Sequence, residues 1–158
     1  MNSLEFYRSF HTNPINKFIH AICIPLIILS IINISAGIEK FELIFHIQEP
    51  FKLRVVQIYK YYHILVLHLI IYLTNYGIKI ASIMSIYFGL ILIISYGWRK
   101  YDNLWYRNSW IIFITAWIMQ FVGHAIEGNR PALVTSLTQS VFQAPIYTLE
   151  YYFPSLFL

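Results

Sequence analysis

The sequence contains little charge for its size. Only 11% of its 158 residues are charged, roughly half the fraction found in an ordinary soluble domain. In contrast, 58% are hydrophobic, and the mean hydropathy is +0.60. A core built from so short a chain cannot bury this much apolar surface, so lipid has to cover part of it. The composition therefore excludes a typical soluble domain and predicts an integral membrane protein.

Cysteine is also scarce. The single Cys23 excludes an internal disulfide and a metal site with several cysteine ligands. The 11 Lys and Arg residues are scattered along the chain without a cluster, and the net charge is +4. Isolated basic residues near apolar runs indicate contact with anionic lipid headgroups, and we expect no nucleic-acid partner. The length predicts one domain over residues 1–158.

The apolar runs predict an all-α integral membrane bundle of about four transmembrane helices. The expected spans cover residues 18–37, 61–76, 80–98 and 110–127, and the second is short for a full crossing. Asn13 and Pro14 are typical of an N-cap and first helical position, so the first helix should begin at Pro14. Residues 1–17 form an amphipathic lead-in, and residues 38–60 an interfacial segment. After Pro131 we expect a helix to about Phe142, then a bend and a short amphipathic segment.

Polar side chains interrupt the apolar pattern near both ends of the chain. Gln120, His124 and Glu127 share one face of the last span, and Asn16 and His20 share one face of the first. An even number of crossings puts both groups on the same side of the membrane, together with His11 and Glu150. Ionisable groups at membrane depth are costly without partners and are functional candidates.

Two interpretations of these polar groups remain open. They can be a satisfied polar patch where a helix leaves the membrane, or a metal or acid–base site. Three imidazoles with nearby carboxylates and no cysteine suit Fe(II), Zn or Mn. In that case Gln120, Asn16 and Gln139 would orient the imidazoles. His63 and His68 point to different sides of one helix and are typical of bundle packing, and His46 of a solvated interfacial position.

Two blocks resemble the Mpo1-like family. Residues 6–27, FYRSFHTNPINKFIHAICIPLI, match its opening Y-x-x-x-H-x-x-P-x-N-K-x-I-H-x-x-G-I-P-L, with Cys23 where the family often has glycine. Residues 117–150 resemble W-x-x-Q-F-I-G-H-x-x-x-E-x-x-x-P-A-L, with two residues instead of three between His124 and Glu127, followed by a glutamine, an Ala-Pro pair and a closing glutamate. The matching positions with polar or proline side chains are His11, Asn16, His20, Gln120, His124, Glu127, Pro131, Gln139 and Glu150.

The resemblance implies a membrane-bound, Fe(II)-dependent dioxygenase. Such enzymes α-oxidise long-chain 2-hydroxy fatty acids with O₂ to acids one carbon shorter, in the pathway that degrades the sphingolipid base phytosphingosine in fungi. On this basis His11, His20 and His124 are expected to bind iron, with Glu127 or Glu150 completing the metal shell or orienting a histidine. Gln120 and Asn16 complete the expected site, and Lys17 or Arg130 is a candidate for holding the substrate carboxylate. The expected location is the inner membrane of a bacterium or the endoplasmic reticulum of a eukaryote, in contact with membrane lipids.

Two alternatives have a different chemistry. A di-iron lipid hydroxylase or desaturase needs about eight histidines in closely spaced clusters, whereas this chain has six, and no two lie closer than five positions apart. A non-catalytic membrane scaffold or lipid-binding protein would use the histidines only to satisfy one another. Metal content separates this scaffold from an enzyme.

Overall fold

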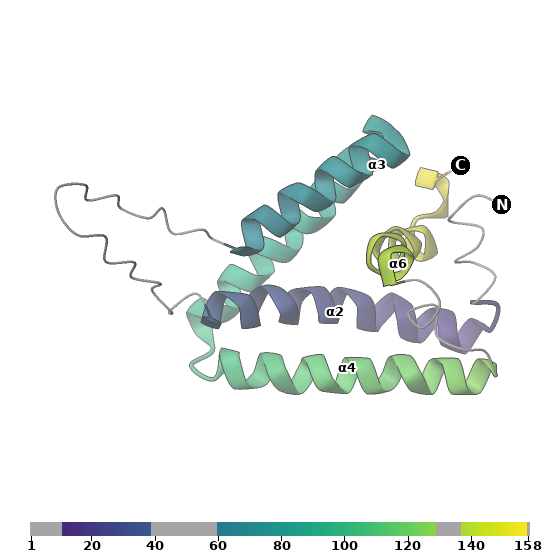
Figure 1. Cartoon of the computed structure of the whole chain (residues 1–158). Helices are drawn as coiled ribbons and strands as arrows, with labels where there is room; N and C mark the ends of the chain where they lie inside the picture. The colour runs from purple at the N-terminus through teal and green to yellow at the C-terminus, as the bar shows by residue number, and fades with distance from the viewer. Residues whose placement is uncertain (1–10, 39–59, 129–136, 158) are drawn as a thin grey trace.

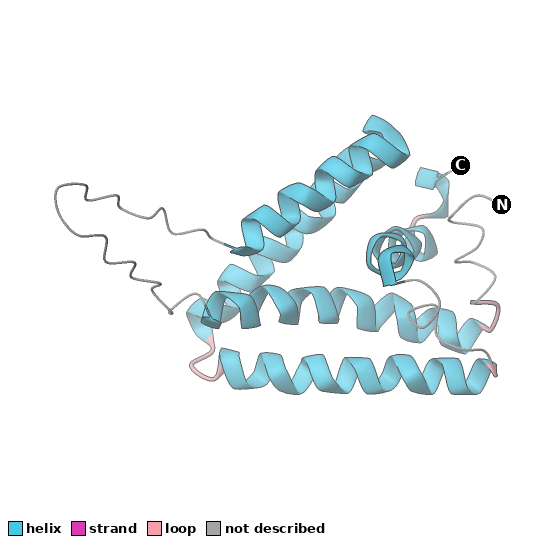
Figure 2. Cartoon of the chain, viewed as in Figure 1, coloured by secondary structure: helices cyan, strands magenta, loops and turns pink. Residues whose placement is uncertain are grey.

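The computed structural model describes residues 11–38, 60–128 and 137–157, and the side chains at 60–64 and 137–140 are not among those described. The described residues form helices α2 (Pro14–Ile38), α3 (Lys60–Tyr101), α4 (Trp105–Glu127) and α6 (Leu137–Tyr152), followed by the short 3₁₀ helix η1 (Pro154–Phe157). Within these ranges there is no strand (Figure 2). The predicted all-α class is confirmed. The expected segments at residues 1–10 and 39–59 lie outside the described part.

Helices α2 and α4 lie side by side and antiparallel (Figure 1). At one end Gly37 faces the ring of Tyr106, and at the other Gly123 faces Asn16. A side chain at either glycine would collide with the facing residue, so the missing Cβ atoms allow the two helices to approach closely. Between these contacts, a buried apolar cluster joins the helices: Ile19, Cys23, Ile27 and Ala116.

The beginning of α2 follows the predicted capping pattern. Its first residue is Pro14, and the side-chain oxygen of Asn13 accepts a hydrogen bond from the Ile15 amide at 2.8 Å. A proline at this position costs the helix no hydrogen bond, because an N–H here would have no partner within the helix. The prediction that the first span begins here is confirmed.

Helix α3 turns back on itself at Gly77. This residue has φ 78° and ψ 176°, a conformation open essentially to glycine alone. In a straight helix His68 and Phe88 would lie about 30 Å apart, yet their ring centroids are 6.0 Å apart. The two arms therefore form a hairpin, which Figure 1 shows as two neighbouring ribbons. Its apolar interface also takes in α6 and contains Leu65, Tyr72, Ala81, Met84, Phe88 and Ile146.

Three helices of the described residues are long and apolar enough to cross a membrane: α2, α3 from Leu65 onward, and α4. Many of their large apolar side chains are exposed, as lipid contact requires, with Ile78 at 72% and Ile93 at 70%. The first arm of α3, residues 60–76, is about 25 Å long, less than the roughly 30 Å of a hydrocarbon core. The expected count of about four crossings is therefore not confirmed.

Helix α6 differs from the expected tail. It runs from Leu137 to Tyr152 and includes Pro145, so the bend predicted after Phe142 is wrong. A proline removes one hydrogen bond from the preceding turn. In this turn the hydroxyl of Tyr72 donates to the carbonyl oxygen of Phe142 at 2.9 Å. The proline leaves the carbonyl of Val141 without its helical donor, and the Tyr72 contact joins the neighbouring carbonyl of α6 to α3.

The predicted polar loop between the last two spans is shorter than expected. Helix α3 extends to Tyr101 and α4 begins at Trp105. The carboxylate of Asp102 accepts hydrogen bonds from the Trp98 indole at 2.7 Å, the Leu104 amide at 2.8 Å and the Asn108 amide group at 2.7 Å. These donors, the Trp98 indole first, lower the pKa of Asp102 below its usual value.

We predict that Gly77→Ala destabilises the hairpin by about 1–3 kcal/mol, because a side chain is strained at this φ and ψ. Gly89→Ala is the matched control, since Gly89 lies inside the second arm with open space around its Cα. That change should be neutral or stabilise by up to about 1 kcal/mol through helix propensity. Thermal unfolding of both variants in detergent measures the difference. Equal melting temperatures would contradict the assigned turn.

Candidate metal centre

Three histidines from distant parts of the sequence meet at one end of the α2–α4 pair. His11 lies just before α2, His20 in its second turn, and His124 in the last turn of α4. Their ring centroids are separated by 4.4 Å (His11–His20), 5.1 Å (His11–His124) and 4.9 Å (His20–His124). All three side chains are buried, and one ring nitrogen of each lies within 4.8 Å of the others.

The hydrogen bonds around the rings leave nitrogens available for a ligand. Nδ1 of His20 lies 3.0 Å from the carbonyl oxygen of Asn16. Because a carbonyl only accepts, Nδ1 carries the proton and the lone pair lies on Nε2. Nδ1 of His124 is buried and has no hydrogen-bond partner among the described residues. A backbone carbonyl that fixes the tautomer of a histidine is the usual support of a metal ligand.

The donor set fits a divalent transition metal. A zinc–nitrogen bond is about 2.0–2.1 Å, and other divalent ions of this row are similar, so ligand nitrogens around one ion lie about 3–4 Å apart. The three ring nitrogens need to close by roughly 1 Å to reach this spacing. Imidazole ligands without thiolates suit iron or zinc, and Cys23 is buried in the apolar cluster between α2 and α4. Within the described residues, no other group of three His, Cys, Asp or Glu side chains lies close enough to hold an ion.

Glu127 binds the segment that carries His11. Its Oε1 accepts hydrogen bonds from the Thr12 amide, from the Thr12 hydroxyl at 2.9 Å and from the Asn13 amide at 2.8 Å. Its Oε2 accepts one from the side-chain amide of Asn16. Both oxygens are therefore occupied by residues 12–16, which favours the expected orienting role over direct coordination of the ion.

Asn16 connects this carboxylate to the histidines. Its side chain is completely buried and donates to Glu127, while its backbone carbonyl accepts from His20. A side chain at Gly123 would collide with the Asn16 amide. The glycine that precedes His124 therefore makes room for the residue that orients His20.

Of the remaining predicted residues, Gln120 and Glu150 lie near the triad. Gln120 is buried one turn before His124 on α4, and its Nε2 has no hydrogen-bond partner among the described residues. Glu150 of α6 lines a pocket that also contains His11. Pro131 and the side chain of Gln139 lie outside the described residues, so their expected contributions stay predictions.

Two residues near the triad, Tyr147 and Thr12, were not among the predicted site residues. The ring of Tyr147 lies 5.2 Å from that of His11, and its hydroxyl donates to the His11 carbonyl oxygen at 3.3 Å. Thr12 supplies two of the donors to Glu127. For Tyr147, its spacing of three residues from Glu150 on one helix is a signal that could have drawn attention to it.

His68 lies elsewhere, among aromatic residues. Its ring centroid is 4.8 Å from that of Phe142 and 6.0 Å from that of Phe88. This position between α3 and α6 agrees with the expected packing role. His46 and the side chain of His63 lie outside the described part of the chain.

We predict that Glu127→Gln weakens metal binding by about 10–100-fold, the usual effect of losing a group that orients ligands. The glutamine side chain would place an NH₂ donor against the hydrogen-bond donors of residues 12–16. The contacts that hold His11 and His20 in position would then be weakened. Titration of the metal-free protein in detergent with Co(II) measures the affinity. Asp102→Asn is the matched control, because it removes a carboxylate that accepts three hydrogen bonds at the opposite end of α4.

The absorption spectrum of the cobalt complex separates the two roles of Glu127. If it only orients the segment, the weaker complex keeps the wild-type spectrum, because the ligand set is unchanged. A spectrum altered by the loss of one oxygen ligand would show instead that Glu127 coordinates the ion.

The fold and the site define an all-helical protein with membrane-type helices and a buried group of three histidines. A family model described as 2-hydroxy-palmitic acid dioxygenase Mpo1-like matches residues 1–155. The chain is 30% identical over 149 residues to 2-hydroxy-palmitic acid dioxygenase MPO1 of Saccharomyces cerevisiae, and this region covers 94% of the chain and 76% of the yeast protein. No solved structure matches it. The chain belongs to the Mpo1-like family, as its two sequence blocks predicted.

Proposed function

We propose that this protein is an Fe(II)-dependent dioxygenase that shortens long-chain 2-hydroxy fatty acids by one carbon. Two findings support the proposal: membership of the Mpo1-like family, and the name of the yeast relative, a 2-hydroxy-palmitic acid dioxygenase. The single observation that carries it is the convergence of His11, His20 and His124 in a buried group beside a pocket.

The three imidazoles would hold the ion on one side. Bound Fe(II) supplies a Lewis acid for the hydroxyl and carboxylate of the substrate and a redox centre for O₂. Asn16 keeps Nε2 of His20 directed away from its own helix backbone, and Glu127 keeps His11 next to the other two rings. These residues thus hold the ligands in place before substrate arrives, which reduces the cost of reorganisation.

The overall reaction balances with one O₂. A 2-hydroxy acid and O₂ give the acid one carbon shorter, carbon dioxide and water. Removal of C1 and oxidation of C2 release four electrons, and one O₂ accepts four. No further reductant is needed.

The membrane location suits this substrate. Its long acyl chain partitions into lipid, and the apolar surfaces of α2, α3 and α4 are exposed to the same environment. The polar end of the substrate can then reach the histidines at the end of the α2–α4 pair. We also propose that the protein contacts membrane lipids and lies in the bacterial inner membrane or in the endoplasmic reticulum membrane.

We predict that the purified protein loaded with Fe(II) converts 2-hydroxypalmitate to pentadecanoate in the presence of O₂. Chelation of the metal should abolish the activity, and Fe(II) should restore it. His20→Ala and His124→Ala should each lose bound iron and at least 100-fold in activity while keeping their helical circular dichroism. His68→Phe is the matched control, because it retains an aromatic ring between α3 and α6 and leaves the triad intact.

The assay also separates the alternatives. Folded wild-type protein that neither holds iron nor consumes O₂ with any 2-hydroxy acid would contradict the proposal and support a scaffold or lipid-binding protein. Iron binding with hydroxylation or desaturation of the acyl chain, without loss of C1, would indicate a different membrane metalloenzyme.

A further inference from the structure

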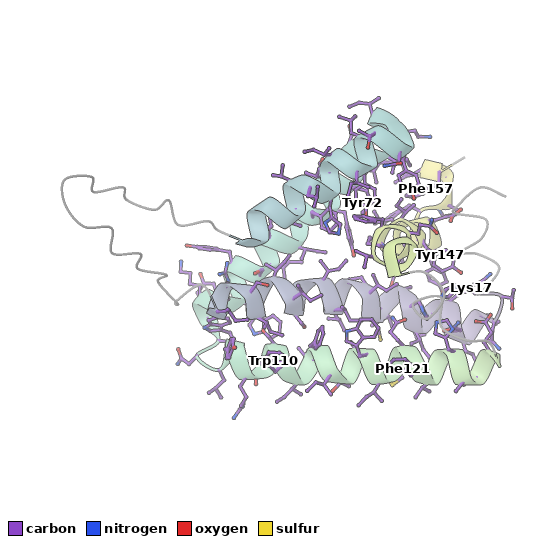
Figure 3. The ribbon with its side chains drawn as sticks, in the orientation of Figure 1. Lys17, Tyr72, Trp110, Phe121, Tyr147 and Phe157 are labelled. Atoms are coloured by element: carbon purple, nitrogen blue, oxygen red, sulfur yellow. The ribbon has the colours of Figure 1, made fainter. Side chains whose placement is uncertain are left out.

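A pocket of about 370 Å³ lies beside the histidines. It is lined by His11, Thr12, Lys17, Tyr147, Glu150 and Tyr151, which come from the start of α2, the segment before it, and α6. This volume is typical of a small-molecule site. Figure 3 shows Lys17 and Tyr147 at the same end of the molecule, where α6 lies over the first turns of α2.

The pocket is continuous with the three-histidine group. His11 belongs to both, and it lies 4.4 Å from His20 and 5.1 Å from His124 between ring centroids. Tyr147 also packs against His11, and their ring centroids are 5.2 Å apart. A molecule that occupies the pocket therefore lies next to one member of the triad.

The charged groups of the pocket have opposite signs. Lys17 is half-buried and presents an ammonium group, which binds a carboxylate as a point charge. Glu150 is also half-buried and presents a carboxylate, which accepts hydrogen bonds but donates none when it is ionised. A molecule that carries an anionic group next to a hydroxyl donor complements both.

We infer that this pocket binds the polar end of the 2-hydroxy acid, with Lys17 paired to its carboxylate and Glu150 accepting a hydrogen bond from its 2-hydroxyl group. The inference rests on the proposed function, and it assigns the choice of substrate to two residues that need not touch the metal. A simple fatty acid has no hydroxyl to offer, so its carboxylate meets Glu150 without a compensating hydrogen bond. Glu150 therefore selects against it.

Binding without turnover tests the assignment. Three probes are titrated into the iron-loaded protein in detergent under anaerobic conditions: 2-hydroxypalmitate, palmitate and 1,2-hexadecanediol. Lys17→Met keeps most of the length of the side chain and removes its charge. It should therefore weaken the binding of 2-hydroxypalmitate about tenfold or more. Binding of the uncharged diol should be unchanged, and Lys17→Arg should restore most of the affinity for the acid.

Glu150→Gln should act in opposite directions on the two acids. The binding of 2-hydroxypalmitate should weaken, because a neutral amide oxygen is a poorer hydrogen-bond acceptor than a carboxylate. The binding of palmitate should become tighter, because the negative charge of Glu150 no longer repels its carboxylate. The preference for the hydroxylated acid should fall about tenfold. A residue with a purely structural role would change both acids in the same direction.

Lys100→Met is the control for the lysine variant, because Lys100 is exposed at the other end of the molecule, over the ring of Tyr101. Iron content of each variant reports on the triad. If Lys17→Met binds 2-hydroxypalmitate as well as the wild type does, the assignment is wrong even when the enzyme is active. If the acid depends on Lys17 for binding but the wild type with iron and O₂ leaves it intact, the pocket assignment holds and the proposed reaction fails.

Discussion

One carboxylate holds the end of α4 against the start of α2. Glu127 closes α4, and its oxygens accept four hydrogen bonds from Thr12, Asn13 and Asn16, more than a hundred positions earlier in the sequence. Charge-assisted hydrogen bonds are about twice as strong as neutral ones, and here several converge on a single group. This contact, together with that of Tyr147 to the His11 carbonyl, holds the segment carrying His11 beside α2 and α4.

The close approach of α2 and α4 makes this contact possible. Gly37 and Gly123, at opposite ends of the pair, leave space for Tyr106 and Asn16. A second polar contact stabilises α2 against α3, where the hydroxyl of Ser95 donates to the side-chain oxygen of Asn33 at 2.6 Å. Both residues are fully buried. In an apolar environment such contacts fix one arrangement of the helices, because few competing partners exist.

The two ends of the bundle differ in their chemistry. The end that contains the triad combines ionisable groups with a pocket, whereas the opposite end is closed by a tight loop around Asp102. Between them, the helices expose many large apolar side chains, which is compatible with a membrane protein. A substrate with a polar end and a long chain matches this division, because each part of it meets an environment of its own kind.

The sequence by itself predicted the helical class, the long apolar helices, the start of the first helix at Pro14 and the polar faces of the first and last spans, whereas the full set of candidate site residues came from the family resemblance. The former follow from local properties: hydropathy, capping preferences and polar residues with helical spacing. Tertiary structure decided the turn of α3 at Gly77, the passage of α6 through Pro145, and the partners of Glu127. Each goes with contacts between residues distant in the sequence, such as Tyr72 with Phe142 or Glu127 with Thr12. Periodicity along a chain carries no information about which hydrogen-bond donor a carboxylate will meet. Only the packing of α2 against α4 and α6 shows that Glu127 faces the start of the chain, while Glu150 faces the pocket.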